Sequence, residues 1–183
     1  VSLETFRDYL GVLDADDTQD ALLVRCADAA TAEIEQRTSL IFVSRAMTEV
    51  LDGSGRADQW LRGLPISGVT SVTVDGAALG GETYIIDAAR GRLRKTSGVW
   101  REGVANVTVV YTAGYGAQDA ATLPQDVVRA GLDLAKAIYD EKKSGAITLS
   151  SIQAMGPGSL MLKPGKLPPS IERVLERWRD VRV

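Results

Sequence analysis

The distribution of apolar positions divides the chain into helical ends and a β-rich middle. Apolar residues recur at helical spacing over 3–10, where Ser2 would cap the helix, over about 18–37 and 123–143, and in the segment PPSIERVLERWRDV. Between the second and third helices, apolar and polar residues alternate with a period of two, as in NVTVVYTAGYG at 106–116. We therefore predict an α+β fold, a small helical bundle with an inserted antiparallel β module.

Short strands bounded by glycine turns are predicted in the middle segment, which we assign to a β module at 40–118. The helical core is then formed by 1–39 and 120–183 together. Gly114 and Gly116 end the module, where residues without a side chain let the chain reverse direction. The six strand candidates are one in 40–53, two in 60–76 around a Leu-Pro bend, and one each in 83–87, 90–95 and 106–112.

The composition limits the classes of protein to which the chain can belong. The chain of 183 residues is 45% hydrophobic, enough for the core of one domain, or of one domain with an insertion. No apolar run approaches the roughly 20 residues of a membrane span, and VSLETFRDYL lacks the pattern of a secretory signal. One cysteine, Cys26, allows no intrachain disulfide and suits a reducing compartment. We expect no contact with a membrane.

Catalysis is disfavoured because the chain has no histidine. This absence excludes Ser-His-Asp and Cys-His catalysis and histidine-ligated metal sites. The DADD at 14–17 lacks the glycine and glutamate of an EF-hand loop and fits a helix cap better. The segment GPGSLMLKPGK at 156–166 lacks the spacing of a phosphate-binding loop. No residue set resembles a catalytic constellation, so we predict no enzyme, no cofactor and no bound metal.

Charge is unevenly spread along the chain, although the net charge is only −3. Residues 1–36 hold nine acidic side chains against two arginines, whereas basic residues gather at 90–101 and again at 163–182. Such asymmetry can orient a subunit against its neighbours. The alternative interpretation is that these clusters are the solvated faces of separate helices and strands.

Two arginine-rich segments are candidate interfaces. Arg90, Arg92 and Arg94 alternate along a predicted strand and would share one face. No aromatic residue is interleaved with them to stack on bases, which favours a subunit or partner contact over nucleic-acid binding. The second segment is ERWRDVRV, where Trp and Arg, both enriched in strong interfaces, occur together; its candidates are Trp178, Arg177, Arg179, Arg182 and Val183. Alternatively, the last helix packs Trp178 on its own bundle.

The order of these elements resembles the head–tail connector (adaptor) proteins of long-tailed double-stranded DNA phages and of gene transfer agents. The resemblance runs from residue 2 to about 143, with a looser similarity in LPPSIERVLERWRDV. The segments that carry it are, in order, LETFRDYLGV, DADDTQDALL, IEQRTSLIF, LRGLPISGVTSVTVDG, VTVVYTAGYG and LPQDVVRAGLDLAKAIYDEK.

The resemblance implies a ring, usually of twelve copies, beneath the portal protein in the neck of a virion assembled in the host cytoplasm. Such a ring would extend the DNA channel and dock the next neck component, a stopper or tail-completion protein. DNA would pass through without sequence-specific binding, and acidic side chains that face the channel would repel its phosphates. The candidates for this lining are Asp14, Asp16, Asp17 and Asp20.

Residues 146–183 form the part of the chain that we expect to order on meeting the portal, because the loop 146–166 is rich in glycine and proline. Trp178 and its neighbours would then contact the portal or an adjacent subunit. Two alternatives stay open, another neck protein such as a stopper or tail-completion protein, and a small DNA-binding accessory domain. A sequence pI near 5.1 and the lack of a continuous basic stripe disfavour DNA binding.

Overall fold

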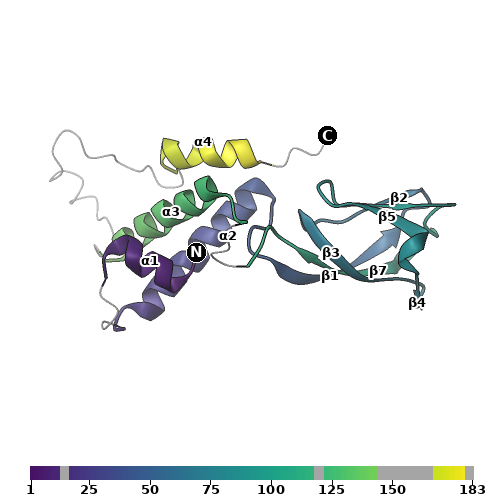
Figure 1. Cartoon of the computed structure of the whole chain (residues 1–183), viewed down its shortest axis with the longest axis horizontal. Coiled ribbons are helices and arrows are strands. Elements are labelled where there is room, and N and C mark those ends of the chain that lie inside the picture. Colours follow the sequence, from purple (N-terminus) through teal and green to yellow (C-terminus); the bar gives the residue numbers. More distant parts are fainter. Residues whose placement is uncertain (13–16, 118–121, 144–166, 180–183) are drawn as a thin grey trace. The chain divides into compact units, whose positions relative to one another are not determined.

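A computed structural model of the whole chain describes residues 1–12, 17–117, 122–143 and 167–179. The chain forms two compact units, one made of Val1–Thr38 with Leu123–Val183 and the other of Ser39–Thr122 (Figure 1). Within the described residues, the first unit holds helices and the second holds antiparallel sheets. The predicted α+β fold class is therefore confirmed.

The helical unit contains α1 to α4. Local contacts fix both ends of α1. The Ser2 side chain accepts a hydrogen bond from the Thr5 amide at 3.1 Å, and Gly11 ends the helix with a left-handed φ of 69°. The four helices in the described ranges are α1 (Leu3–Leu10), α2 (Asp20–Thr38), α3 (Gln125–Lys143) and α4 (Pro169–Trp178).

Packing between these helices combines an apolar core with polar links at its rim. Leu23 and Ile34 of α2 and Leu134 of α3 are among the buried side chains. At the rim, Arg7 of α1 pairs with Asp20 of α2 at 2.5 Å, and the Tyr139 hydroxyl of α3 donates to Gln19. The first link joins two consecutive helices and the second joins residues 120 positions apart, so the rim contacts hold α1 and α3 against the start of α2.

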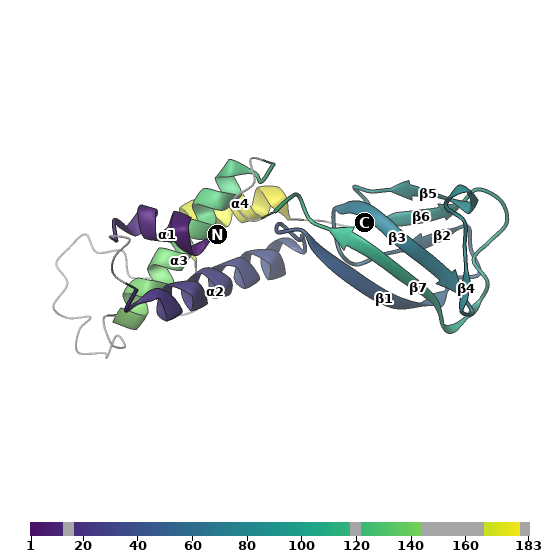
Figure 2. The same cartoon turned by 60° about the horizontal axis from the view of Figure 1, so that its bottom comes forward.

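The β unit contains two sheets, which Figure 2 shows as separate layers. All their strand pairs are antiparallel. The four-stranded sheet has the order β1 (Arg45–Gly53), β7 (Gly103–Ala113), β3 (Ile66–Val74) and β4 (Ala77–Ala78). The three-stranded sheet has the order β2 (Asp58–Trp60), β6 (Arg92–Lys95) and β5 (Tyr84–Asp87). A short 3-10 helix, η1 (Gly81–Thr83), precedes β5.

A single hydrophobic cluster holds the β unit together. On β7, Val107, Val109 and Tyr111 are fully buried, whereas the residues between them are half-buried, which confirms the predicted alternation. Leu93 of β6 and Trp100 fill the same cluster. The Trp100 indole donates to the backbone carbonyls of Ala57 at 3.0 Å and of Leu93 at 3.3 Å, so this large side chain is buried with its polar atom satisfied.

Several predicted strand boundaries were wrong. The strand predicted at 40–53 begins at Arg45, and the chain before it makes irregular contacts, such as the Ile41 amide with the Leu64 carbonyl at 2.7 Å. The strand predicted at 90–95 begins at Arg92, because Gly91 has a φ of 67° and belongs to the preceding turn. Two of the strands expected to be short are longer, since β3 has nine residues and β7 has eleven.

Candidate interaction surfaces

The outer face of the three-stranded sheet brings charged, aromatic and aliphatic side chains together. Arg92 pairs across the strands with Trp60 on one side and Asp87 on the other, and Arg94 pairs with Asp58 and Ile85. Residues directly opposite each other point to the same face of a sheet. Two cross-strand rows therefore lie side by side; we call them together the arginine face, made of Trp60, Arg92 and Asp87 in one row and Asp58, Arg94 and Ile85 in the other.

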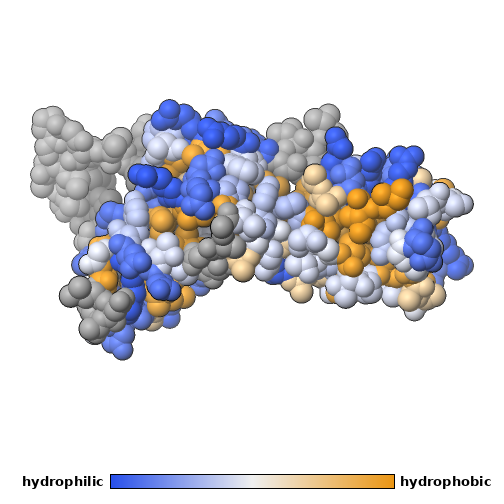
Figure 3. All heavy atoms as spheres, viewed as in Figure 1, coloured by the Kyte–Doolittle hydropathy of each residue, from blue (hydrophilic) through white to orange (hydrophobic). Residues whose placement is uncertain are grey.

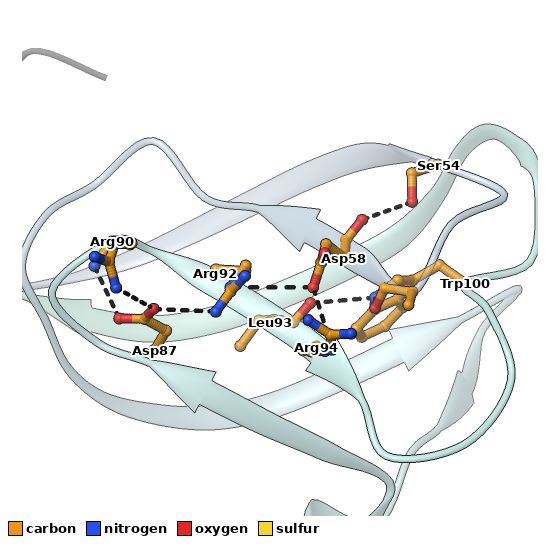
Figure 4. Close-up of polar contacts among 9 residues, drawn as sticks. Ser54, Asp58, Asp87, Arg90, Arg92, Leu93, Arg94 and Trp100 are labelled. Carbon is orange, nitrogen blue, oxygen red and sulfur yellow. Dashed lines mark hydrogen bonds and ion pairs between the residues drawn. The ribbon is translucent and has the colours of Figure 1, made fainter. Parts of the chain in front are cut away.

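Arg92 is held at the centre of this face. Its Nη2 lies 3.3 Å from Asp87 Oδ2 and its Nε lies 4.0 Å from Asp58 Oδ1, as Figure 4 shows. Its guanidinium carbon also lies 5.9 Å from the centre of the Trp60 ring, within the range of a cation–π contact. Arg94 Nε reaches the same Asp58 oxygen at 3.9 Å. Arg92 is thus fixed between two carboxylates and an indole.

Arg90 belongs to the turn between β5 and β6 and not to the strand, so the prediction that all three arginines alternate along one strand was wrong. It still reaches the edge of the arginine face, because its amide and its Nη1 bind Asp87 at 3.3 and 3.2 Å. Partial burial by itself would raise the pKa of Asp87, but the hydrogen bonds from Arg90 and the charges of Arg90 and Arg92 outweigh burial and lower it.

The sequence analysis missed four of the six members of this face, the hydrophobic Trp60 and Ile85 and the acidic Asp58 and Asp87. Trp60 is 48% exposed and Ile85 is 60% exposed, although both are large hydrophobic residues. Figure 3 shows apolar residues beside hydrophilic ones on the surface of the β unit. No aromatic residue is interleaved with the arginines in the sequence, but strand pairing brings Trp60, 32 positions before Arg92, opposite that arginine. Only the register between strands could have revealed this.

The C-terminal helix is anchored to α3 through its last residues. The Trp178 indole donates to Asp126 Oδ2 at 2.9 Å, and Arg177 Nη1 lies 3.4 Å from the same oxygen. Trp178 is half-buried, whereas Arg177 and Arg179 are exposed. The structure therefore places the tryptophan on its own bundle and leaves two arginines at the surface. Arg182 and Val183, also predicted for this interface, lie outside the described residues.

The acidic candidates near the start of α2 differ in their surroundings. Asp17 is exposed just before the helix, whereas Asp20 is engaged by Arg7. Asp14 and Asp16 lie outside the described residues. On α1, Glu4 and Asp8 are exposed as well, and they were not singled out from the sequence. The described part of this region therefore offers acidic side chains on both sides of the loop that joins α1 and α2.

The glycine turn at the end of β7 is a site of close backbone approach. Gly114 has a φ of 123°, and a Cβ atom there would lie 2.6 Å from Ser44 Cα. Its amide donates to the Pro65 carbonyl at 2.8 Å, and the Gly116 carbonyl accepts from the Ser44 amide at 2.7 Å. A side chain at Gly114 would collide with backbone atoms, so this position requires glycine.

Neither a metal-binding cluster nor a membrane-spanning helix is found in the parts of the chain that the structure describes. No three acidic or cysteine side chains in these ranges are grouped so that they could hold a metal ion. None of the helices described combines the length and the apolar character needed to cross a bilayer. The candidate functional groups described above are charged and aromatic side chains at the surface.

Exposed tryptophan and arginine side chains are typical of the surfaces through which structural and interaction proteins contact other chains, because both residue types are enriched among interface hot spots. The chain belongs to the Head completion protein (HCP) family, whose family model matches residues 1–181. No curated protein matches the sequence. Membership of this family confirms the expected relationship to proteins of the head–tail junction.

Solved structures of gene transfer agent (GTA) particles contain similar chains. A chain in the neck of an empty GTA particle with C6 symmetry matches with a TM-score of 0.72 and 23% identity, covering 100% of this chain and 91% of that one. A chain in the neck of a native GTA particle with C12 symmetry matches with a TM-score of 0.72 and 25% identity, over 99% and 89%. A chain of the native GTA virion matches with a TM-score of 0.71 and 25% identity, over 100% and 91%.

Proposed function

We propose that this chain is a structural head–tail connector (adaptor) that forms a ring in the neck of a phage or phage-derived particle. The observation that carries the proposal is the similarity, over 99% of this chain, to a chain in a GTA neck with C12 symmetry. A similarity that extends through both compact units supports an equivalent place in an assembly and not merely a shared module. The family name, Head completion protein, supports the same location.

In this proposal twelve copies form the ring, the portal lies on one side of it, and a stopper or tail-completion protein docks on the other. The duplex passes through the ring without sequence-specific binding. The combination of a helical unit with a β unit favours the adaptor, whereas a structure dominated by β with little helix would favour a stopper or tail-completion protein. An acidic pI of about 5.1 supports a channel to which DNA phosphates do not adhere.

The three surfaces described above and the glycine turn receive roles in this proposal. The end of α4, with Arg177 and Arg179 exposed beside an anchored Trp178, contacts the portal or a neighbouring subunit. Arg90, Arg92 and Arg94 contact a subunit or another partner. The acidic residues around the start of α2 face the channel, where exposed Asp17 is the clearest candidate. Gly114 and Gly116 serve the turn that returns the chain to the helical unit.

The mass of the purified chain, alone and mixed with the portal of its particle, tests the proposal. We expect a monomer alone and a closed ring on the portal, measured by native mass spectrometry. A small stable oligomer that ignores the portal would contradict the adaptor role. Binding to an assembled neck that already contains a ring, but not to the portal itself, would point instead to a stopper or tail-completion protein.

A further inference from the structure

The arginine face carries polar groups that are not fully engaged by the residues that the structure describes, some of them exposed and two of them buried. Arg94 contacts Asp58 only at 3.9 Å, longer than a hydrogen bond, and its side chain is 56% exposed. Among the described residues, Asp58 Oδ1 and Arg92 Nε are buried atoms that make no hydrogen bond. An exposed indole and an exposed isoleucine adjoin them. Such a face is suited to being covered by another chain.

The arginine face has a net positive charge, which favours an acidic partner. Three guanidinium groups, of Arg90, Arg92 and Arg94, meet two carboxylates, of Asp58 and Asp87, which leaves one positive charge in excess. The excess lies at the outside, since the Arg90 side chain is 72% exposed and that of Arg94 is 56% exposed, against 29% for Arg92. The interspersed carboxylates and the isoleucine favour a protein surface over a run of DNA phosphates.

The same chain offers a surface of the opposite charge on α1. Residues 1–38 contain nine acidic side chains and three basic ones, a balance of −6. Glu4 and Asp8 are four positions apart, so they lie on one side of the helix, and both are exposed. The one arginine of α1, Arg7, is paired with Asp20 at 2.5 Å with its side chain only 12% exposed, and therefore leaves their charge at the surface. Tyr9, 39% exposed, adds an aromatic ring beside them.

We propose that the arginine face of one copy binds the acidic side of α1, carrying Glu4 and Asp8, on a second copy of this chain. The inference rests on the proposed ring and names one of its subunit contacts. Carboxylates of the second copy would take the outward N–H groups of Arg94 and Arg90, and Tyr9 would pack near Trp60 and Ile85. Because the two surfaces differ, the contact is head-to-tail, the kind that propagates around a ring until it closes.

Charge reversal tests this contact. Arg94→Glu and a Glu4→Lys/Asp8→Lys variant should each weaken association between copies by about tenfold or more, because like charges then face each other across the interface. Combining the two sets of changes in one chain should restore association. Arg101→Glu is the matched control, since Arg101 lies on the same unit with a side chain that is 76% exposed but outside the arginine face. Trp60→Ala should weaken association without altering the circular dichroism spectrum.

Cross-linking locates the contact independently of these effects. An Arg94→Cys chain is mixed with a differently tagged Asp8→Cys chain and treated with a short bifunctional maleimide, with and without portal. Cys26 contributes little background, because it is 2% exposed and burial raises the pKa of its thiol. We expect a mixed dimer that carries both tags and forms far more readily than an Arg94→Cys homodimer.

The outcomes separate this inference from the proposed function. A mixed cross-link in a chain that does not bind the portal would retain the contact and reject the adaptor role. A closed ring on the portal that gives no mixed cross-link and tolerates Arg94→Glu would overturn the contact and retain the adaptor. If Arg94→Glu instead weakens binding to duplex DNA and leaves association between copies unchanged, the face is a nucleic-acid surface and the inference is wrong.

Discussion

The hydroxyl of Tyr111 accepts a hydrogen bond from the amide of Gly63 at 2.9 Å, and a Cβ atom at Gly63 would lie only 2.6 Å from that hydroxyl oxygen. Tyr111 is fully buried near the C-terminal end of β7 and also donates to Glu49. The Glu49 carboxylate in turn accepts from the backbone amide of Arg62 at 3.0 Å. The loop after β2 is thereby tied to the sheet through a buried phenol.

Gly63→Ala should destabilise the β unit. The added methyl group would press on the rigid Tyr111 ring, on Met47 Sδ at 2.8 Å and on Ile41 Cδ1 at 3.1 Å. We expect a loss of about 1–3 kcal/mol in the free energy of unfolding, the usual cost of overpacking. Urea denaturation measures it. Gly68→Ala is the control, because no atom lies within 4 Å of a Cβ there; equal losses at both positions would contradict the explanation.

Local signals in the sequence were sufficient for much of the fold. Ser2 and Gly11 predict the ends of α1 because both act on the backbone within one helical turn. The alternation along β7 predicts its buried face, since one strand is enough to show a period of two. Asp75-Gly76 likewise predicts the hairpin of β3 and β4, where both residues have a positive φ.

Local signals in the sequence could not predict the arginine face. Its members come from three strands, and Trp60 meets Arg92 only because β2 and β6 pair in one register. The arginine spacing alone wrongly placed Arg90 on the strand, whereas Gly91, with a φ of 67°, forms a turn before β6 begins at Arg92. Contacts that depend on strand register are long-range, and a pattern read along a single chain does not contain them.

Trp178→Phe should loosen the end of α4. The substitution keeps an aromatic ring but removes the indole N–H that donates to Asp126 at 2.9 Å. Loss of this hydrogen bond should cost about 1 kcal/mol, which corresponds to roughly fivefold faster exchange of the α4 amides. Hydrogen exchange monitored by mass spectrometry measures the change. Glu176→Gln, at an exposed position of the same helix, should leave exchange unchanged; an equal effect of both variants would exclude this role for the Trp178–Asp126 bond.

Stability should fall in acid partly through Asp87. Its pKa is lowered in the folded chain, where the hydrogen bonds and charges of Arg90 and Arg92 outweigh the opposing effect of burial. Between the folded and unfolded pKa values the unfolded chain binds more protons, so the stabilising contribution is fully present above the unfolded value of about 3.9 and is lost as the pH falls through the folded value.

Asp87→Asn should therefore flatten the dependence of the free energy of unfolding on pH below about pH 4. Arg90→Gln should raise the pKa of Asp87, which NMR titration of its carboxyl carbon can follow directly. One variant removes the carboxylate of the Asp87–Arg90 pair and the other removes its guanidinium. If the carboxyl titrates at the same pH with and without the Arg90 guanidinium, Arg90 is not what lowers its pKa.

Neutralising the acidic residues before α2 should slow the passage of DNA through an assembled neck. If Asp17 faces the channel as proposed, its carboxylate repels the phosphates and keeps the duplex from adhering to the wall. We expect a chain with Asp14→Asn, Asp16→Asn and Asp17→Asn to assemble normally and to deliver less DNA per particle. Asp20→Asn is tested separately, because Asp20 also holds Arg7 at 2.5 Å and its loss would loosen α1 from α2.

The amount of DNA transferred per particle, counted against particles with the unaltered chain, is the measurement. Asp140→Asn is the control, since Asp140 is an exposed carboxylate of α3 that is paired with Lys136 at 2.8 Å. Screening by salt weakens interactions between exposed charges beyond about 10 Å at 0.1 M ionic strength, so the defect should be largest in dilute buffer and shrink as salt is added. Unchanged delivery at low salt would mean that these carboxylates do not face the DNA.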